Sequence, residues 1–160
     1  MRIYIGAIGR LKKSPEHALA NDYFDRVGKL GRTTGITAVE VKEYPESQAA
    51  TAVLRKTDEA TRLLAGCPPQ STIIVLDEHG SQLSSKELAG QIGRFKDGGV
   101  QNLAFLIGGP DGHGDKVLEK TSLKLAFGSM TWPHRLVRIM LAEQIYRSVT
   151  ILLNHPYHRS

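Results

Sequence analysis

Cysteine is nearly absent from this sequence of 160 residues, in which Cys67 is the one thiol. A single cysteine cannot form an internal disulfide, and the cysteine and histidine spacings typical of structural zinc sites are missing. A reducing compartment suits such a chain, and we expect a cytoplasmic protein.

Long hydrophobic runs are missing as well. Nowhere do 18 apolar residues follow one another, so the sequence predicts no membrane-spanning helix and no membrane partner. The apolar stretch within residues 1–10 is shorter than a signal peptide requires, and no small-residue cleavage site follows it. The length and the 41% of hydrophobic residues predict a single globular domain over residues 1–160.

Charge of one sign is nowhere concentrated. The net charge of +5, with a pI near 9.4, favours a polyanionic partner. No lysine-rich tail is present, so charge alone would hold a nucleic acid weakly, and recognition would need a shaped surface.

Buried-strand patterns alternate with helical patterns along the chain. Strands that are apolar on both faces predict an α/β fold, with a mostly parallel sheet and helices on both faces. Ligands of such folds bind beyond the carboxyl ends of the strands, here after Leu76, Ile107 and Phe127. The expected strands are residues 2–9, 36–41, 72–76, 103–107 and 123–127, and the expected helices are residues 15–30, 46–64, 85–97, 116–120 and 133–153.

Two helix starts carry specific signals. Ser14-Pro15 places a capping hydroxyl before a proline, which is favoured at the first helical position. Ser84 and Glu87 have the spacing of a capping box.

The segment after Ile107 holds four glycines in residues 108–114. Glycines let the backbone approach a ligand closely, because no Cβ intervenes. The segment matches neither a Walker loop nor a dinucleotide fingerprint, so a bare structural turn is an alternative.

Residues 127–134 (FGSMTWPH) form a second candidate. Small and polar residues together with Met130 and Trp132 could line a binding site for an adenine. Pro133 favours an extended backbone at Trp132. On composition alone, a hydrophobic connection that packs under the last helix is the favoured explanation.

The carboxyl end, residues 154–160 (NHPYHRS), is rich in side chains that stack and hydrogen-bond. Tyrosine and arginine stack on bases, and arginine or histidine pairs with phosphate. A frayed tail is the plain alternative. His155 and His158 with His113 or His134 could ligate zinc, but no acidic or thiol ligand stands at a telling spacing, so we expect no metal.

Taken together, these segments resemble one family closely. The chain is similar to the SPOUT class of methyltransferases, and within it to the small members that methylate N3 of a pseudouridine in 23S ribosomal RNA. The resemblance covers essentially the whole chain. Several short sequence strings match the family, and their order and spacing together are more specific than any one of them. The matching strings are residues 106–110, 129–131, 133–134, 136–138, 142–147 and 154–159.

The resemblance implies a carboxyl-terminal part threaded into a deep trefoil knot, where true knots are otherwise rare. It also implies S-adenosylmethionine as methyl donor, held largely by backbone, a homodimer with the site near the interface, and ribosomal RNA presented on the assembled ribosome; DNA is not expected as a partner. The donor-binding residues that it implies are Leu76, Gly108, Phe127, Gly128, Ser129, Met130, Thr131 and Trp132.

Catalysis then requires N3 to be aligned with the methyl group and to lose its proton. The catalytic candidates are Tyr157, His158 and Arg138, and the substrate-binding candidates are His134, His155 and Arg159. His113 stands where the family usually has an apolar residue, so we expect it to pack or to lie at a rim.

Two other classes of protein are possible on the residues alone. A phosphate-handling enzyme would need Lys or Arg, or a metal-binding carboxylate cluster, at the strand ends, where Asp77, Glu78 and Asp111 stand. A non-enzymatic ribosome-associated module would bind RNA through its basic last third.

Overall fold

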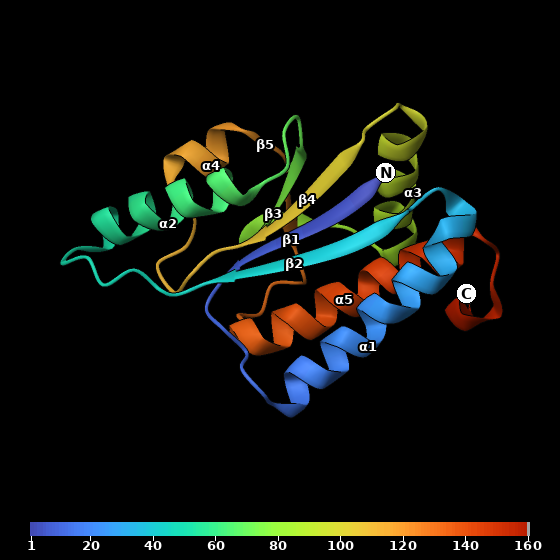
Figure 1. The fold of residues 1–160 in the computed structure, drawn as a ribbon, viewed down its shortest axis with the longest axis horizontal. Helices are drawn as coiled ribbons and strands as arrows, with labels where there is room; N and C mark the ends of the chain where they lie inside the picture. Colours follow the sequence, from blue (N-terminus) through green and yellow to red (C-terminus); the bar gives the residue numbers. More distant parts are fainter. Residues whose placement is uncertain (160) are drawn as a thin grey trace.

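The computed structural model describes residues 1–159, which form one five-stranded sheet flanked by helices (Figure 1). The strands lie in the order β2-β1-β4-β3-β5 and every neighbouring pair is parallel, which confirms the predicted sheet. The strands are β1 (Arg2–Ile8), β2 (Ala38–Tyr44), β3 (Thr72–Gln82), β4 (Asn102–Ile107) and β5 (Thr121–Ala126). The helices are α1 (Pro15–Leu30), α2 (Ala52–Gly66), α3 (Ser85–Asp97), α4 (Asp115–Glu119) and α5 (His134–Leu152), with 3-10 turns at Gly31–Thr34 and Pro156–His158.

Helices cover both faces of the sheet, as predicted. Alternation along β1 sends Ile3 and Ile5 into the larger core cluster, with α1, α3 and α5, and sends Tyr4 and Ile8 into the smaller one, with α2 and α4. Figure 1 shows the same two layers, with α1 and α5 side by side below the sheet and α2 and α4 above it.

Both sequence signals for helix starts are confirmed. The Ser14 hydroxyl accepts a hydrogen bond from the His17 amide at 3.2 Å, and Pro15 opens α1. Ser84 and Glu87 form the complete capping box of α3, in which each side chain accepts from the other's backbone amide.

The predicted and observed boundaries differ most at the start of α2 and at the end of β3, and β2 (Ala38–Tyr44) begins two and ends three residues later than predicted. The helix expected from residue 46 begins at Ala52, because residues 46–50 are held in an irregular path by α2 itself: Glu59 accepts from the Ser47 amide at 2.9 Å, and Arg55 donates to the Ala49 carbonyl at 3.1 Å. The strand expected to end at residue 76 continues to residue 82 after a break in its pairing with β5.

Because all five strands are parallel, their carboxyl ends share one edge of the sheet. That edge receives the three segments on which the sequence analysis concentrated. Within residues 1–159, no helix has the length and apolar character needed to span a membrane.

Candidate functional site

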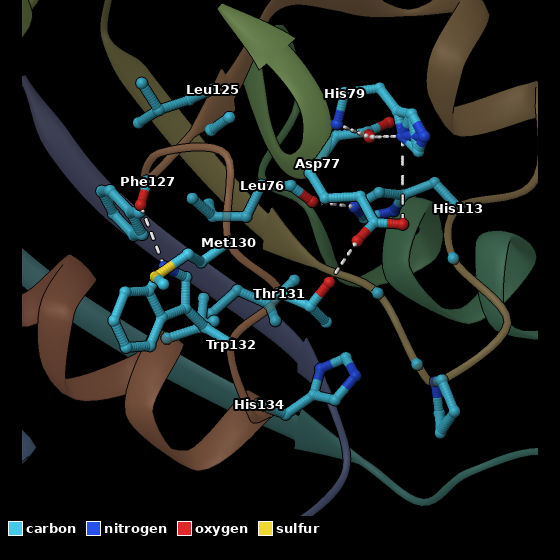
Figure 2. Close-up of a pocket in the computed structure, with 18 of the residues that line it drawn as sticks. Leu76, Asp77, His79, His113, Leu125, Phe127, Met130, Thr131, Trp132 and His134 are labelled. Carbon is cyan, nitrogen blue, oxygen red and sulfur yellow. Dashed lines mark hydrogen bonds and ion pairs between the residues drawn. The ribbon is translucent and has the colours of Figure 1, made fainter. Parts of the chain in front are cut away.

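A cavity of about 440 Å³ opens beside the break in the pairing of β3 with β5 and at the carboxyl ends of β4 and β5 (Figure 2). Its walls come from residues 76–79 within β3, from the turn after Ile107 and from the segment that begins at the end of β5, so the structure brings together the three places that the sequence singled out. The predicted donor-binding residues that line it are Leu76, Gly108, Phe127, Gly128, Met130, Thr131 and Trp132. The remaining one, Ser129, is exposed and does not line this cavity.

The glycine turn is packed so closely that side chains would not fit. A Cβ on Gly109 would lie 2.7 Å from Glu59 Oε2 and 3.1 Å from Ile8, and one on Gly114 would lie 2.6 Å from the Lys56 carbonyl oxygen. These glycines therefore place the loop against α2 and the end of β1, which answers the question of why the segment is rich in glycine.

An ion pair that the sequence analysis did not foresee fastens the same turn. Arg55 of α2 donates from Nε and Nη2 to the two carboxylate oxygens of Asp111, at 2.7 and 3.2 Å. The hydrogen bond from Arg55 lowers the pKa of Asp111. The partners lie 56 residues apart in the sequence, and no local pattern links them.

His113 packs within this wall, as expected. Its side chain is buried, and Nε2 lies 3.1 Å from the Leu76 carbonyl oxygen, so the ring joins the glycine turn to β3. Burial lowers the pKa of His113 and outweighs the opposing hydrogen bond. The imidazole is therefore neutral at pH 7 and serves as a donor to the carbonyl, not as a base.

The third turn, residues 127–133, closes on itself. The Trp132 indole donates to the Phe127 carbonyl at 3.0 Å, and the Thr131 hydroxyl donates to Glu78 at 3.2 Å across the cavity mouth (Figure 2). Gly128 has a left-handed φ of 99°, which a side chain would strain. With these contacts in place, the segment forms one wall of the cavity.

The charged side chains that line the cavity are carboxylates: Asp77, Glu78 and Asp111. Asp77 also accepts a hydrogen bond from the His79 amide at 2.9 Å. The cavity therefore offers a negative potential to a ligand, together with an apolar floor that includes Leu76 and Phe127.

Arg138, a predicted catalytic residue, lies outside this lining. It is 5% exposed, and its guanidinium donates to Glu43 at 2.7 Å and to the Gly9 carbonyl at 2.6 Å. Gly9 directly follows β1, and Glu43 lies near the end of β2. The geometry therefore gives Arg138 a structural task one helical turn away from His134, which does line the cavity.

The carboxyl-terminal tail also lies away from the cavity of its own chain. Tyr157 packs edge-on against Tyr146, with ring centroids 4.7 Å apart, and its hydroxyl lies 3.2 Å from Glu143. Burial and hydrogen bonding raise the pKa of Tyr157, so its hydroxyl is protonated here. Figure 1 shows the C-terminus at the far end of α5 from His134, about 27 Å along a helix of this length.

The predicted set His155, Tyr157, His158 and Arg159 is thus not assembled with the cavity within one chain. Among residues 1–159 there is no group of three or more His, Cys, Asp or Glu side chains placed to hold a metal ion.

The family model and the relatives that match this protein cover nearly all of the chain. The family model described as "Predicted SPOUT methyltransferase" matches residues 1–158. Proteins named ribosomal RNA large subunit methyltransferase H are similar over the full chain. The one from Mesorhizobium japonicum is 46% identical over 160 residues, all of both chains. The one from Chelativorans sp. is 47% identical over 99% of this chain and 91% of its own.

A similar solved structure is the SpoU methyltransferase AviRb from Streptomyces viridochromogenes in complex with the cofactor AdoMet. It is 12% identical with a TM-score of 0.42, and the match covers 96% of this chain and 61% of that one. On the family match and the full-length identity with its relatives, the chain belongs to the SPOUT methyltransferases, the knotted α/β family that its motifs indicated, in the group named ribosomal RNA large subunit methyltransferase H.

Proposed function

We propose that this protein is a cytoplasmic, S-adenosylmethionine-dependent methyltransferase that methylates N3 of a pseudouridine in 23S ribosomal RNA on the assembled ribosome. The relatives' names support methylation of large-subunit ribosomal RNA. The observation that carries the proposal is the cavity of about 440 Å³, whose charged lining is acidic and whose walls are turns rich in glycine.

The cavity fits the donor in charge and in shape. Its volume lies in the range of about 300–1,000 Å³ typical of small-molecule sites. S-adenosylmethionine carries a sulfonium, an ammonium and a carboxylate group, and Asp77 and Glu78 would attract its two cations. The adenine would lie on the apolar lining at Leu76 and Phe127, with its edge facing backbone groups.

The same charges argue against a phosphate-handling enzyme. A nucleoside triphosphate would bring several negative charges against Asp77 and Glu78. The one arginine bound to the glycine turn, Arg55, is already engaged by Asp111. A phosphate ligand would therefore have to break that pair.

When bound, the donor supplies a methyl group that is already activated. The chain must then hold the nucleoside in line, which provides much of the rate enhancement, and assist loss of the N3 proton. His134 lines the cavity at the start of α5 and is placed to contact the target nucleoside. Tyr157 and His158 are the predicted pair for the proton and for contacts to the base.

Because each tail lies away from its own cavity, a homodimer is the simplest way to unite them. We infer that the tail of one subunit completes the cavity of the other. Exposed apolar side chains support a partner surface on this side of the molecule: Leu19 on α1, Leu136 on α5, and Met130 and Trp132 beside the cavity.

Titration calorimetry with S-adenosylmethionine tests the donor, with ATP as the control ligand. We expect micromolar affinity for the donor and affinity for ATP weaker by at least about tenfold. Tighter binding of ATP would contradict the proposal.

Mixed dimers test the tail. One subunit lacks residues 155–160 and the other carries Gly108→Trp, which fills the cavity. Each homodimer should be inactive, while the mixture should regain about a quarter to a half of the activity. Full activity of the truncated homodimer would remove the tail from the mechanism.

The substrate is tested by mass mapping of 23S ribosomal RNA from cells lacking the protein. Loss of one methyl group from a single pseudouridine, restored by the purified protein and donor, is the expected result. Intact methylation would refute the assignment.

A further inference from the structure

The loop between β1 and α1, residues 9–13, lies at the same edge of the sheet as the cavity. It follows Ile8, whose side chain approaches the position of a Cβ on Gly109 to 3.1 Å. Figure 1 shows this loop beside the start of α5. The loop therefore borders the glycine turn on one side and the first turns of α5, which begin at His134, on the other.

A buried network holds the backbone of this loop. Arg138 donates to the Gly9 carbonyl at 2.6 Å and to Glu43 Oε2 at 2.7 Å, and the same carboxylate oxygen accepts from the Leu11 amide at 2.9 Å. The Leu11 side chain is 5% exposed and anchors the loop in the core. These contacts join β1, β2 and α5 through one short segment.

The fixed backbone turns the remaining side chains outward. Arg10, Lys12 and Lys13 are exposed on either side of the buried Leu11. Lys12 adopts a left-handed φ of 55°, which a residue with a side chain rarely takes up unless its surroundings enforce it. Such enforced conformations are concentrated at functional sites.

These three cations have no ion-pair partner in the part of the chain that the structure describes. The neighbouring carboxylates are engaged elsewhere, since Glu43 binds Arg138 and Glu16 lies 3.8 Å from Arg135. The positive charge of the loop therefore remains available to a ligand.

We propose that the loop formed by residues 9–13 binds the phosphate backbone of the substrate RNA next to the donor cavity, with Arg10, Lys12 and Lys13 as phosphate contacts. Arg138 is then a positioning residue that holds the loop and touches no substrate. The inference rests on the proposed function, because it supplies the backbone contact that a cavity lined by carboxylates cannot provide.

Phosphate contacts place an RNA without reading its sequence, and each contact releases counterions when it forms. The test is the variant Lys12→Gln/Lys13→Gln. Its control is Lys29→Gln/Arg32→Gln, which removes the same charge from exposed positions at the opposite end of α1, about 24 Å away. Binding to purified 70S ribosomes is measured between 50 and 200 mM salt, together with methyl transfer and donor affinity.

The loop variant should reduce the slope of log affinity against log salt by about 1.5, and should raise KM for ribosomes about tenfold. Its kcat and donor affinity should stay within about twofold of wild type. The control should behave as wild type. Equal salt slopes for the two variants would overturn the inference.

A photo-crosslinker at position 13 provides a second measurement. Crosslinking to ribosomal RNA supports the inference, and crosslinking only to a ribosomal protein overturns it. If the wild-type protein transferred no methyl group to ribosomes that lack the modification, the proposed function would itself have failed, which is a distinct outcome.

The positioning role of Arg138 is tested by coupling. Glu43→Gln/Arg138→Gln removes both charges of the buried pair and frees the loop. In that background the substitutions at Lys12 and Lys13 should raise KM by less than about threefold. An undiminished tenfold effect would show that the loop needs no positioning by Arg138.

Discussion

Replacing Arg138 by methionine keeps an unbranched apolar stem and removes the guanidinium group with its charge. The Glu43 carboxylate is then left with the Leu11 amide as its hydrogen-bond donor, and the Gly9 carbonyl loses its donor. Side-chain exposures of 6% for Arg138 and 24% for Glu43 describe a pair that is buried at one end and reached by water at the other.

The magnitude follows from this geometry. Removing one partner of a fully buried pair costs about 3–5 kcal/mol, because an unpaired charge remains. Since water reaches Glu43, we expect about 2–3 kcal/mol for Arg138→Met at pH 7, or a fall in Tm of roughly 5–10 °C for a chain of this size. The double variant Glu43→Gln/Arg138→Met should recover about half of the loss.

The effect should depend on pH. Burial pushes the pKa of Glu43 up, but the hydrogen bonds from Leu11 and Arg138 outweigh it and leave that pKa below its ordinary value. The pair's contribution to stability is therefore present above about pH 4.5 and is lost as the pH falls through the folded-state pKa. In Arg138→Met, burial dominates and protonation relieves the unpaired charge.

Both effects shrink the stability gap between wild type and Arg138→Met as the pH falls from 7 towards 4. Urea unfolding at one fixed protein concentration measures the gap, because dimerisation would otherwise shift the apparent stability. A gap under about 0.5 kcal/mol at pH 7, or one that widens in acid, would refute the reasoning.

Three further predictions concern the walls of the cavity. Gly114→Ala should lower the free energy of unfolding by about 1–3 kcal/mol, because its Cβ would meet the Lys56 carbonyl oxygen at 2.6 Å. The control Gly28→Ala, with open space around it in the interior of α1, should raise that free energy by about 0.5–1 kcal/mol in the same urea titration. Arg55→Met should weaken donor binding by about two- to fivefold in calorimetry, because the ion pair with Asp111 that fastens the glycine turn is partly exposed and screened by solvent; unchanged affinity would show that the turn holds without it. His113→Gln keeps a donor for the Leu76 carbonyl and removes a titrating group. Because the folded-state pKa of His113 is depressed, wild type should lose stability relative to this variant as the pH falls below about 6.5, and a pH-independent difference would contradict the buried neutral imidazole.

The sheet and the turns that line the cavity were predictable because their signals are local. Strands such as β4 are apolar on both faces, which only a sheet covered on both sides explains. The turns at Gly108 and Phe127 follow strands directly, and parallel strands bring their carboxyl ends to one edge. Adjacency in the sequence was therefore enough to place them.

The features that sequence reasoning missed depend on contacts across the fold. Nothing near Arg138 in the sequence indicates a partner 95 residues away. Arg138 was therefore predicted to be catalytic, whereas the structure shows it holding Glu43 and the Gly9 carbonyl. The late start of α2 has the same cause, since tertiary hydrogen bonds to Glu59 and Arg55 override the helical propensity of residues 46–50. Where the tail lies could not be read from its composition.

The indole in the third turn is the only one in the sequence. At 38% exposure and bound to the Phe127 carbonyl, Trp132 lies between a polar and an apolar environment. Any occupant of the neighbouring cavity would change that environment and hence the emission of the fluorophore. The protein thus carries its own optical probe, and stopped-flow fluorescence could time the arrival of donor and of ribosome separately, without a label.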